Sequence, residues 1–181
     1  MPLESETLTL EEAVADLEDE KEELADEMAQ IHPDERTDEN ADYLKLGQQV
    51  GEIERYLGGL DWVRDEFGSD VEFSLSGLTT AETLEVNDRG NDLRSETITP
   101  TKSTNNIESI FWVAKGIDEA PFVDDDADYD AKCAAVRNLP RQMTDWLESR
   151  INDLSTVGNR NGGNFDELLQ EKTEQYHQTS S

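Results

Sequence analysis

Two heptad patterns between Leu10 and Phe67 constrain the fold of this chain more than any other feature. In each pattern apolar residues recur at alternating steps of four and three, which is the 3.5-residue period of a coiled coil. A stripe this narrow covers only one seam of a helix, so each helix needs a partner. The nearest partner is the other helix, folded back across the break that contains Pro33. The sequence therefore predicts an antiparallel coiled-coil helical hairpin over residues 1–68. Its seam includes Leu17, Leu24, Met28, Val50, Ile53, Leu57 and Leu60.

Local signals mark the ends of the two helices. Thr9 lies three residues before Glu12, which is the spacing of a capping box. Pro33 disfavours helical backbone just before it, so the first helix should end near Ile31. The glycine pair at 58–59 weakens the second helix by about 1 kcal/mol per residue relative to Ala and makes a bend there plausible. Residues 1–8 are short and polar, and we expect them to be loose.

The acidic composition limits the kinds of partner that the chain can have. Among 181 residues, 44 are Asp or Glu and 15 are Lys or Arg, which gives a net charge of −29. One explanation for this acidic composition is adaptation to a salt-rich cytoplasm. Another is a partner that binds negatively charged surfaces, as when a protein imitates DNA. The acids are spread over every segment, which favours the first explanation. Because no Lys/Arg cluster exists to neutralise phosphates, we expect no nucleic-acid partner.

Cysteine usage and hydropathy set two further limits. Cys133 is the single cysteine, so an internal disulfide and a Cys-based zinc site are excluded. It lies among alanines, which favours a small buried apolar role. The N-terminus has no basic region followed by an apolar run, and no apolar stretch approaches 18 residues. We therefore expect an intracellular protein with no membrane partner.

Residues 69–157 predict a small, mainly α-helical domain with one or two short strands. An apolar/polar alternation at 71–75 indicates a strand. Thr79 and Glu82 have the spacing of a second capping box, and turn composition at 88–92 should end the helix that they open. Further helices are predicted from about residue 105 to 117, from 129 to 139 and from 140 to 154. Residues 158–181 should be a flexible linker and tail, with a short helix possible at 165–176.

No constellation predicts a catalytic, metal or cofactor site. The aspartates at 124–130 resemble the start of a calcium loop, but Tyr129 and Ala135 stand where Gly and Glu are needed. They fit better as an acidic first helical turn. His32 and His177 have no nucleophile in a recognisable elbow.

A magnesium-dependent pyrophosphohydrolase stays open as an alternative. All-α enzymes of this kind use carboxylates on facing helices, and the hairpin would bring Asp26 roughly level with Asp42. In a chain with 44 acidic residues, such spacings arise by chance. No basic residues flank these carboxylates to hold phosphates. The residues concerned are Glu22, Glu23, Asp26, Glu39 and Asp42.

Aromatic residues of the second half offer a partner surface. Phe111 and Trp146 lie at helical spacing on the apolar faces of their predicted helices, which indicates that they are core residues. Trp112 and Phe122 are less easily buried on the same faces. We expect apolar surface around Trp112, Phe122 and Trp146 to bind a protein partner, since aromatic anchors carry much of the affinity of interfaces.

The order of features in residues 71–157 resembles the tail assembly chaperones of tailed viruses. A strand that runs into a leucine-and-hydroxyl stretch at 73–82 (FSLSGLTTAE), a helix that closes on 113–122 (VAKGIDEAPF) and a last helix that ends in 150–155 (RINDLS) carry the resemblance. The resemblance implies a non-catalytic protein without cofactors that binds tape-measure and tail-tube proteins. With the acidic composition, it implies a virus of an extremely halophilic archaeon.

The leading hypothesis is thus a viral assembly protein in the cytoplasm of the host cell, with possible self-association through the hairpin. Its first alternative is a structural component of the virion, such as a connector or a minor head or tail protein. The pyrophosphohydrolase and the DNA mimic are further alternatives.

Overall fold

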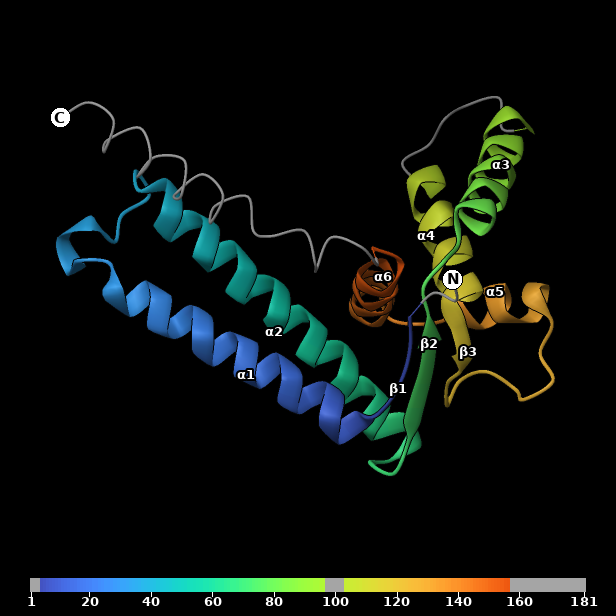
Figure 1. The fold of residues 1–181 in the computed structure, drawn as a ribbon, viewed down its shortest axis with the longest axis horizontal. Helices are drawn as coiled ribbons and strands as arrows, with labels where there is room; N and C mark the ends of the chain where they lie inside the picture. The colour runs from blue at the N-terminus through green and yellow to red at the C-terminus, as the bar shows by residue number, and fades with distance from the viewer. Residues whose placement is uncertain (1–3, 97–102, 157–181) are drawn as a thin grey trace, which may run out of the picture.

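The computed structural model describes residues 4–96 and 103–156, so the predicted linker and tail at 158–181 lie outside the described residues. The fold is mostly helical, with one small antiparallel sheet, and it has helices and strands in mixed order (Figure 1). The strands are β1 (Ser5–Thr9), β2 (Glu72–Ser76) and β3 (Ile117–Glu119). The helices are α1 (Leu10–Gln30), α2 (Ala41–Phe67), α3 (Thr80–Glu96), α4 (Ser103–Gly116), α5 (Tyr129–Arg137) and α6 (Arg141–Ser155), with a 3-10 turn at Pro33–Glu35.

The first two helices form a hairpin, which we call the arm. They lie side by side and run in opposite directions (Figure 1). The capping box of Thr9 and Glu12 is present, and Asn40 caps the start of α2. In the connection, the side chain of Arg36 donates hydrogen bonds to the carbonyls of Ala29 and Ile31, both at 3.0 Å. These bonds satisfy orphan carbonyls at the end of α1 and hold the turn.

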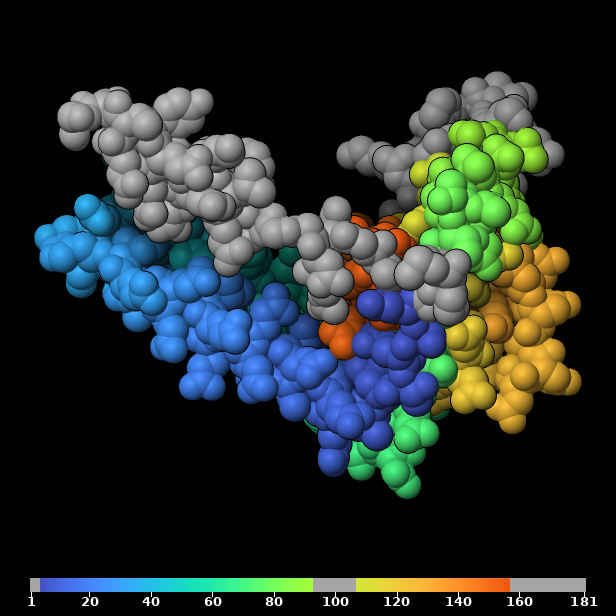
Figure 2. Space-filling view, viewed as in Figure 1, coloured from blue at the N-terminus to red at the C-terminus, as the bar shows by residue number. Residues whose placement is uncertain are grey.

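Burial along the predicted seam is uneven. Leu17, Ile53 and Leu60 are buried, and so is Leu24. Met28, Val50 and Leu57 are only half-buried. The base is covered by α6, whereas only two helices meet farther out. In the space-filling view the arm extends to one side, and α6 is seen between the arm and α3–α5 (Figure 2).

The sheet corrects the expectation that residues 1–8 are loose. Ser5–Thr9 forms β1, which pairs with β2 in antiparallel register, with Leu8 opposite Phe73. On its other side, β2 pairs with β3. Sheet formation is favoured because Leu8 is then buried while the polar side chains next to it stay at the surface.

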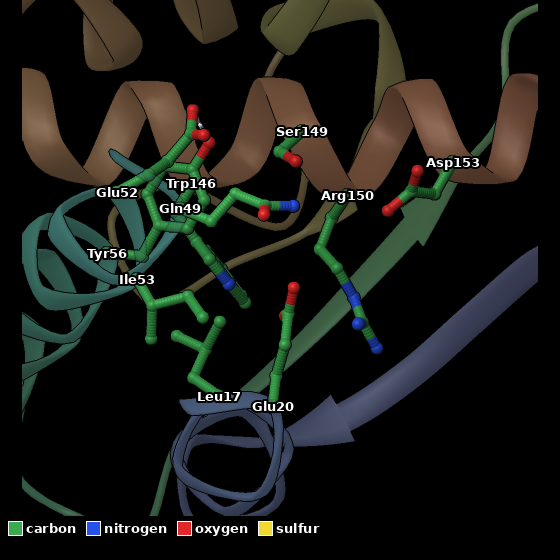
Figure 3. Close-up of a pocket in the computed structure, with 10 residues that line it drawn as sticks. All are labelled: Leu17, Glu20, Gln49, Glu52, Ile53, Tyr56, Trp146, Ser149, Arg150 and Asp153. Carbon is green, nitrogen blue, oxygen red and sulfur yellow. Dashed lines mark hydrogen bonds between the residues drawn. The ribbon is translucent and has the colours of Figure 1, made fainter. Parts of the chain in front are cut away.

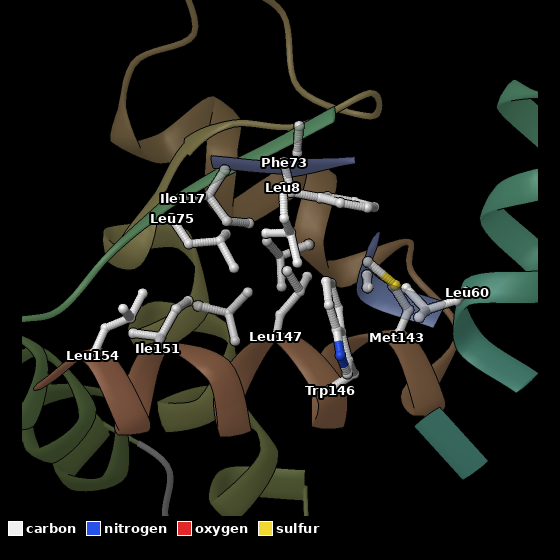
Figure 4. Packing of buried hydrophobic residues seen from close by; sticks show 14 of the residues in the cluster. Leu8, Leu60, Phe73, Leu75, Ile117, Met143, Trp146, Leu147, Ile151 and Leu154 are labelled. Atoms are coloured by element: carbon white, nitrogen blue, oxygen red, sulfur yellow. The ribbon is translucent and has the colours of Figure 1, made fainter. Parts of the chain in front are cut away.

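Helix α6 is the centre of the core. The side chains of Met143, Trp146, Leu147, Ile151 and Leu154 form its buried face, as the sequence predicts. Figure 4 shows this face packed against side chains of the sheet, with Leu60 of α2 beside Met143 at one end. One hydrophobic cluster therefore crosses the predicted domain boundary at residues 68 and 69.

Two predictions about α3 and α4 are wrong in detail. The capping box of Thr79 and Glu82 is present, but α3 continues through the expected turn at 88–92. Tertiary contacts favour the helix here, since Arg89 lies over the rings of Phe111 and Tyr129, 4.9 Å from each centroid. Residue 117 begins β3 instead of ending α4. None of the helices in the described ranges combines the length and the apolar character needed to cross a membrane.

Candidate partner-binding groove

A hollow of about 280 Å³ lies where the arm meets α6 (Figure 3). Helices α1, α2 and α6 each contribute side chains to it, and we call it the arm groove. On α2 and α6 the lining residues recur at steps of three and one, so one face of each helix points into it. The lining is Leu17, Glu20, Gln49, Glu52, Ile53, Tyr56, Trp146, Ser149, Arg150 and Asp153.

The floor of the groove is apolar and belongs to the core. Leu17, Ile53 and Trp146 are buried beneath it. Trp146 packs edge-on against Phe73 of β2, with ring centroids 5.2 Å apart. Trp146 is therefore held from below by the sheet.

Arg150 forms one wall of the groove and joins three elements. Its guanidinium donates two hydrogen bonds to the carboxylate of Glu6 on β1, at 2.8 and 3.0 Å, and a third to Asp16 on α1, at 3.1 Å. Burial opposes the charge of Arg150, but the bonds and charges of Glu6 and Asp16 outweigh it, and the pKa of the guanidinium rises. The guanidinium of Arg150 is thus already paired with carboxylates of the chain itself.

Tyr56 lies on the opposite side of the groove. Its hydroxyl donates a hydrogen bond of 2.9 Å to Glu52, one turn earlier on α2. Burial is the main cause that raises the pKa of Tyr56 to about 12, and the bond to Glu52 adds to it. The ring stays neutral and gives the groove an aromatic surface with a polar tip.

The rim of the groove is acidic. Glu20, Glu52 and Asp153 are exposed and come from α1, α2 and α6 in turn. In Figure 3, Glu20 extends from α1 toward α6. Arg150 is the single cation of the lining and is engaged with Glu6 and Asp16. An apolar floor under an acidic rim can receive an apolar side chain that is flanked by Lys or Arg.

The predicted aromatic surface is wrong for Trp146, whose side chain is only 2% exposed because it fills the space between α6 and β2. Trp112 and Phe122 are half-buried against the core. The indole nitrogen of Trp112 is buried and has no hydrogen-bond partner among the described residues. No ring contact joins the three aromatics within the described ranges. A partner surface at Trp112 and Phe122 stays a prediction.

The acidic residues weighed as metal ligands do not gather. Glu22, Glu23, Asp26, Glu39 and Asp42 are all exposed. Among residues 4–92 and 107–156, no three His, Cys, Asp or Glu side chains form a group that could hold a metal ion.

Two of the aspartates at 124–130, Asp128 and Asp130, lie at the start of α5, as expected for an acidic first turn. The side chain of Asp128 caps α5 by accepting a hydrogen bond from the backbone of Ala131, and Asp130 pairs with Arg89. Cys133 is buried, as predicted, and desolvation raises the pKa of its thiol. A raised pKa disfavours the thiolate that nucleophilic chemistry needs.

Sequence reasoning found the floor of the groove but missed its polar lining. Gln49, Glu52 and Tyr56 repeat at helical spacing beside the seam of α2, and Ser149, Arg150 and Asp153 do so on α6. Such polar stripes next to an apolar stripe look like solvated faces. Only the approach of α6 to the arm shows that they face each other.

No protein family, curated protein or solved structure matches this chain.

Proposed function

We propose that this chain is a non-catalytic assembly protein, similar to the tail assembly chaperones of tailed viruses. In this proposal it works in the cytoplasm of a host with high internal salt. It binds a segment of a tape-measure or tail-tube protein and holds it until assembly. The observation that carries the proposal is the arm groove, with its apolar floor and acidic rim between three helices.

The shape of the groove suits a helical segment of a client. A volume of about 280 Å³ is close to the lower limit for small-molecule sites, and it accommodates one or two side chains better than a whole ligand. Helical segments bind by laying such anchors into a groove between helices. Tyr56 supplies aromatic surface for the anchor.

The charge of the rim selects the type of client segment. Glu20, Glu52 and Asp153 attract Lys or Arg residues that flank the anchor. Molar salt shortens the Debye length to about 3 Å, so only cations in direct contact with the rim are recognised. The client segment is therefore an amphipathic helix with basic residues next to its apolar face.

The arm adds reach to this binding site. We infer that α1 and α2 pack as a coiled coil, since their apolar residues keep the heptad period to the tip. The seam residues Met28 and Val50 are half-buried. They supply apolar surface for a longer client or for a second arm.

The binding experiment uses fluorescent peptides that tile the tape-measure and tail-tube proteins encoded by the same genome. Glu20→Lys and Glu52→Lys should weaken binding of the best peptide, and Glu22→Lys should not. Glu22 is the matched control because it lies on α1, is exposed and does not line the groove. Equal affinity in all three variants would reject the groove as the client site. Replacing Trp112 and Phe122 by Ala tests the aromatic surface in the same assay.

A second experiment tests the assembly role itself. An antibody against the protein is used on lysate of infected cells and on purified virus particles, with mass spectrometry on each band. A chaperone is abundant in the lysate and absent from the particles. Stoichiometric amounts in the particles would instead make it a connector or a minor head or tail protein. Presence in uninfected cells would refute a viral role.

A further inference from the structure

A second hollow differs from the arm groove in its charge. It has a volume of about 250 Å³ and lies among α4, α5 and α6. Ile110, Val136 and Leu139 form its floor. We call it the Arg137 face, after one of the two arginines that line it.

The Arg137 face is neutral on a chain with a net charge of −29. Arg137 and Arg141 balance Asp145 and Glu148, which are the four charged residues of its lining. The arm groove has three carboxylates and one Arg, and the hollow beside Pro121 has five carboxylates and no cation. Of these three hollows, the Arg137 face therefore repels another acidic protein least. A fourth hollow, which shares Arg137, is also balanced in charge, but there Arg89 is paired with Asp130.

Two opposite charges on this face lack partners among the described residues. Arg141 lies 3.5 Å from Asp145, four residues later on α6. Arg137 and Glu148 make no ion pair or side-chain hydrogen bond with any residue that the structure describes. Arg137 is exposed at the end of α5, and Glu148 is partly buried on α6. The face thus presents one cation and one carboxylate, both available for pairing, beside an apolar floor.

We propose that the Arg137 face is the interface between two copies of this chain. A twofold axis brings the same surface of both copies together, so such a surface must be self-complementary. The Arg137 face meets this condition, because Arg137 of each copy can pair with Glu148 of the other. The apolar floors of the two copies then cover each other. This inference does not depend on the identity of the client.

Charge reversal tests the proposal without removing core residues. Sedimentation velocity of the full chain measures the dimerisation constant. The buffer contains about 1 M KCl, because this salt screens repulsion between distant charges and leaves ion pairs in direct contact. Arg137→Glu or Glu148→Arg alone places like charges opposite each other twice per dimer. Each variant should weaken dimerisation about tenfold or more, which corresponds to about 1.4 kcal/mol. Circular dichroism checks that each variant is folded.

The decisive sample is an equal mixture of the two variants. In a mixed dimer the two substituted positions face each other with opposite charges, and the unsubstituted Arg137 and Glu148 form the second pair. Association should therefore return to the wild-type level. Lys45→Glu is the control, because it makes the same charge change on an exposed position of the arm.

Three results would overturn the proposal. One is a wild-type protein that stays monomeric at the highest concentration reached. Another is a mixture that associates as weakly as its components. The third is a Lys45→Glu variant weakened as much as Arg137→Glu, which would place self-association on the arm.

Leu139→Asp is a second variant with a different chemistry. Leu139 is half-buried in the floor, so its loss should weaken dimerisation of a folded protein. Unchanged dimerisation of folded Leu139→Asp would contradict the role of the apolar floor.

Discussion

Arg150 on α6 donates two hydrogen bonds to the carboxylate of Glu6 on β1, although 144 residues separate them in the chain. The same guanidinium reaches Asp16 on α1. The contact therefore ties the sheet, the arm and the central helix at one point. Charge-assisted, two-pronged pairs of this kind fix geometry as well as adding energy.

Arg150→Ala should lower the free energy of unfolding by about 2 kcal/mol, between the values for exposed and buried ion pairs. The loss has two sources, since Glu6 and Asp16 are left as like charges and the packing of the side chain disappears. Urea unfolding at constant KCl measures it. Arg55→Ala is the control, because Arg55 is exposed and lies 3.9 Å from Glu52 on the same helix. Equal effects of the two substitutions would contradict the role given to Arg150.

The glycine pair on α2 provides an internally controlled test of the contact with α6. A Cβ at Gly59 would lie 2.7 Å from the backbone nitrogen of Met143, whereas one at Gly58 would meet nothing within 4 Å. Gly59→Ala should therefore destabilise the protein by about 2 kcal/mol through overpacking. Gly58→Ala should stabilise it by up to about 1 kcal/mol through helix propensity. Thermal unfolding of both variants checks the prediction, and stabilisation by Gly59→Ala would refute the close packing of α2 on α6.

Tyr56 should titrate later than an ordinary tyrosine. Its folded pKa is about 12 against a usual value of 10.0, so folding favours the protonated phenol. The resulting stability is fully present below pH 10 and is lost as the pH rises toward 12. Ultraviolet absorbance of tyrosinate, compared between wild type and Tyr56→Phe, measures this step. A difference spectrum that titrates at pH 10 would show that the hydroxyl is solvated.

The hydroxyl of Tyr56 also contributes to stability. Tyr56→Phe should lower the free energy of unfolding by about 1 kcal/mol, because the bond to Glu52 is lost. Urea unfolding of the variant and the wild type measures the difference. Tyr43→Phe is the control, since the hydroxyl of Tyr43 makes no hydrogen bond with the described residues.

Salt should stabilise the fold. A net charge of −29 opposes the compact state, and the Debye length falls from about 10 Å at 0.1 M salt to about 3 Å at 1 M. The melting temperature should therefore rise with KCl concentration. Replacing Glu22, Glu23 and Asp26 by their amides should stabilise the protein in low salt and have little effect in 1 M KCl. A melting temperature independent of salt would contradict adaptation to a salt-rich cytoplasm.

Local patterns in the sequence predicted the helices well where the signals involve neighbouring residues. Both capping boxes are present, and the buried face of α6 is the predicted one. The prediction of a turn at 88–92 was wrong because, in the helical conformation, the guanidinium of Arg89 packs over aromatic rings of α4 and α5. Of the groove, Leu17, Ile53 and Trp146 were singled out from the sequence, but as seam and partner residues.

The sequence by itself determined the period of the arm, the helix caps and the acidic surface, because these depend on composition and on residues a few positions apart. Tertiary structure decided that Ser5–Thr9 is a strand, since Leu8 gains burial only beside Phe73. It also decided the arm groove and the Arg137 face. Both surfaces arise where α6 meets helices from distant parts of the chain, and no local pattern records which polar stripes will face one another.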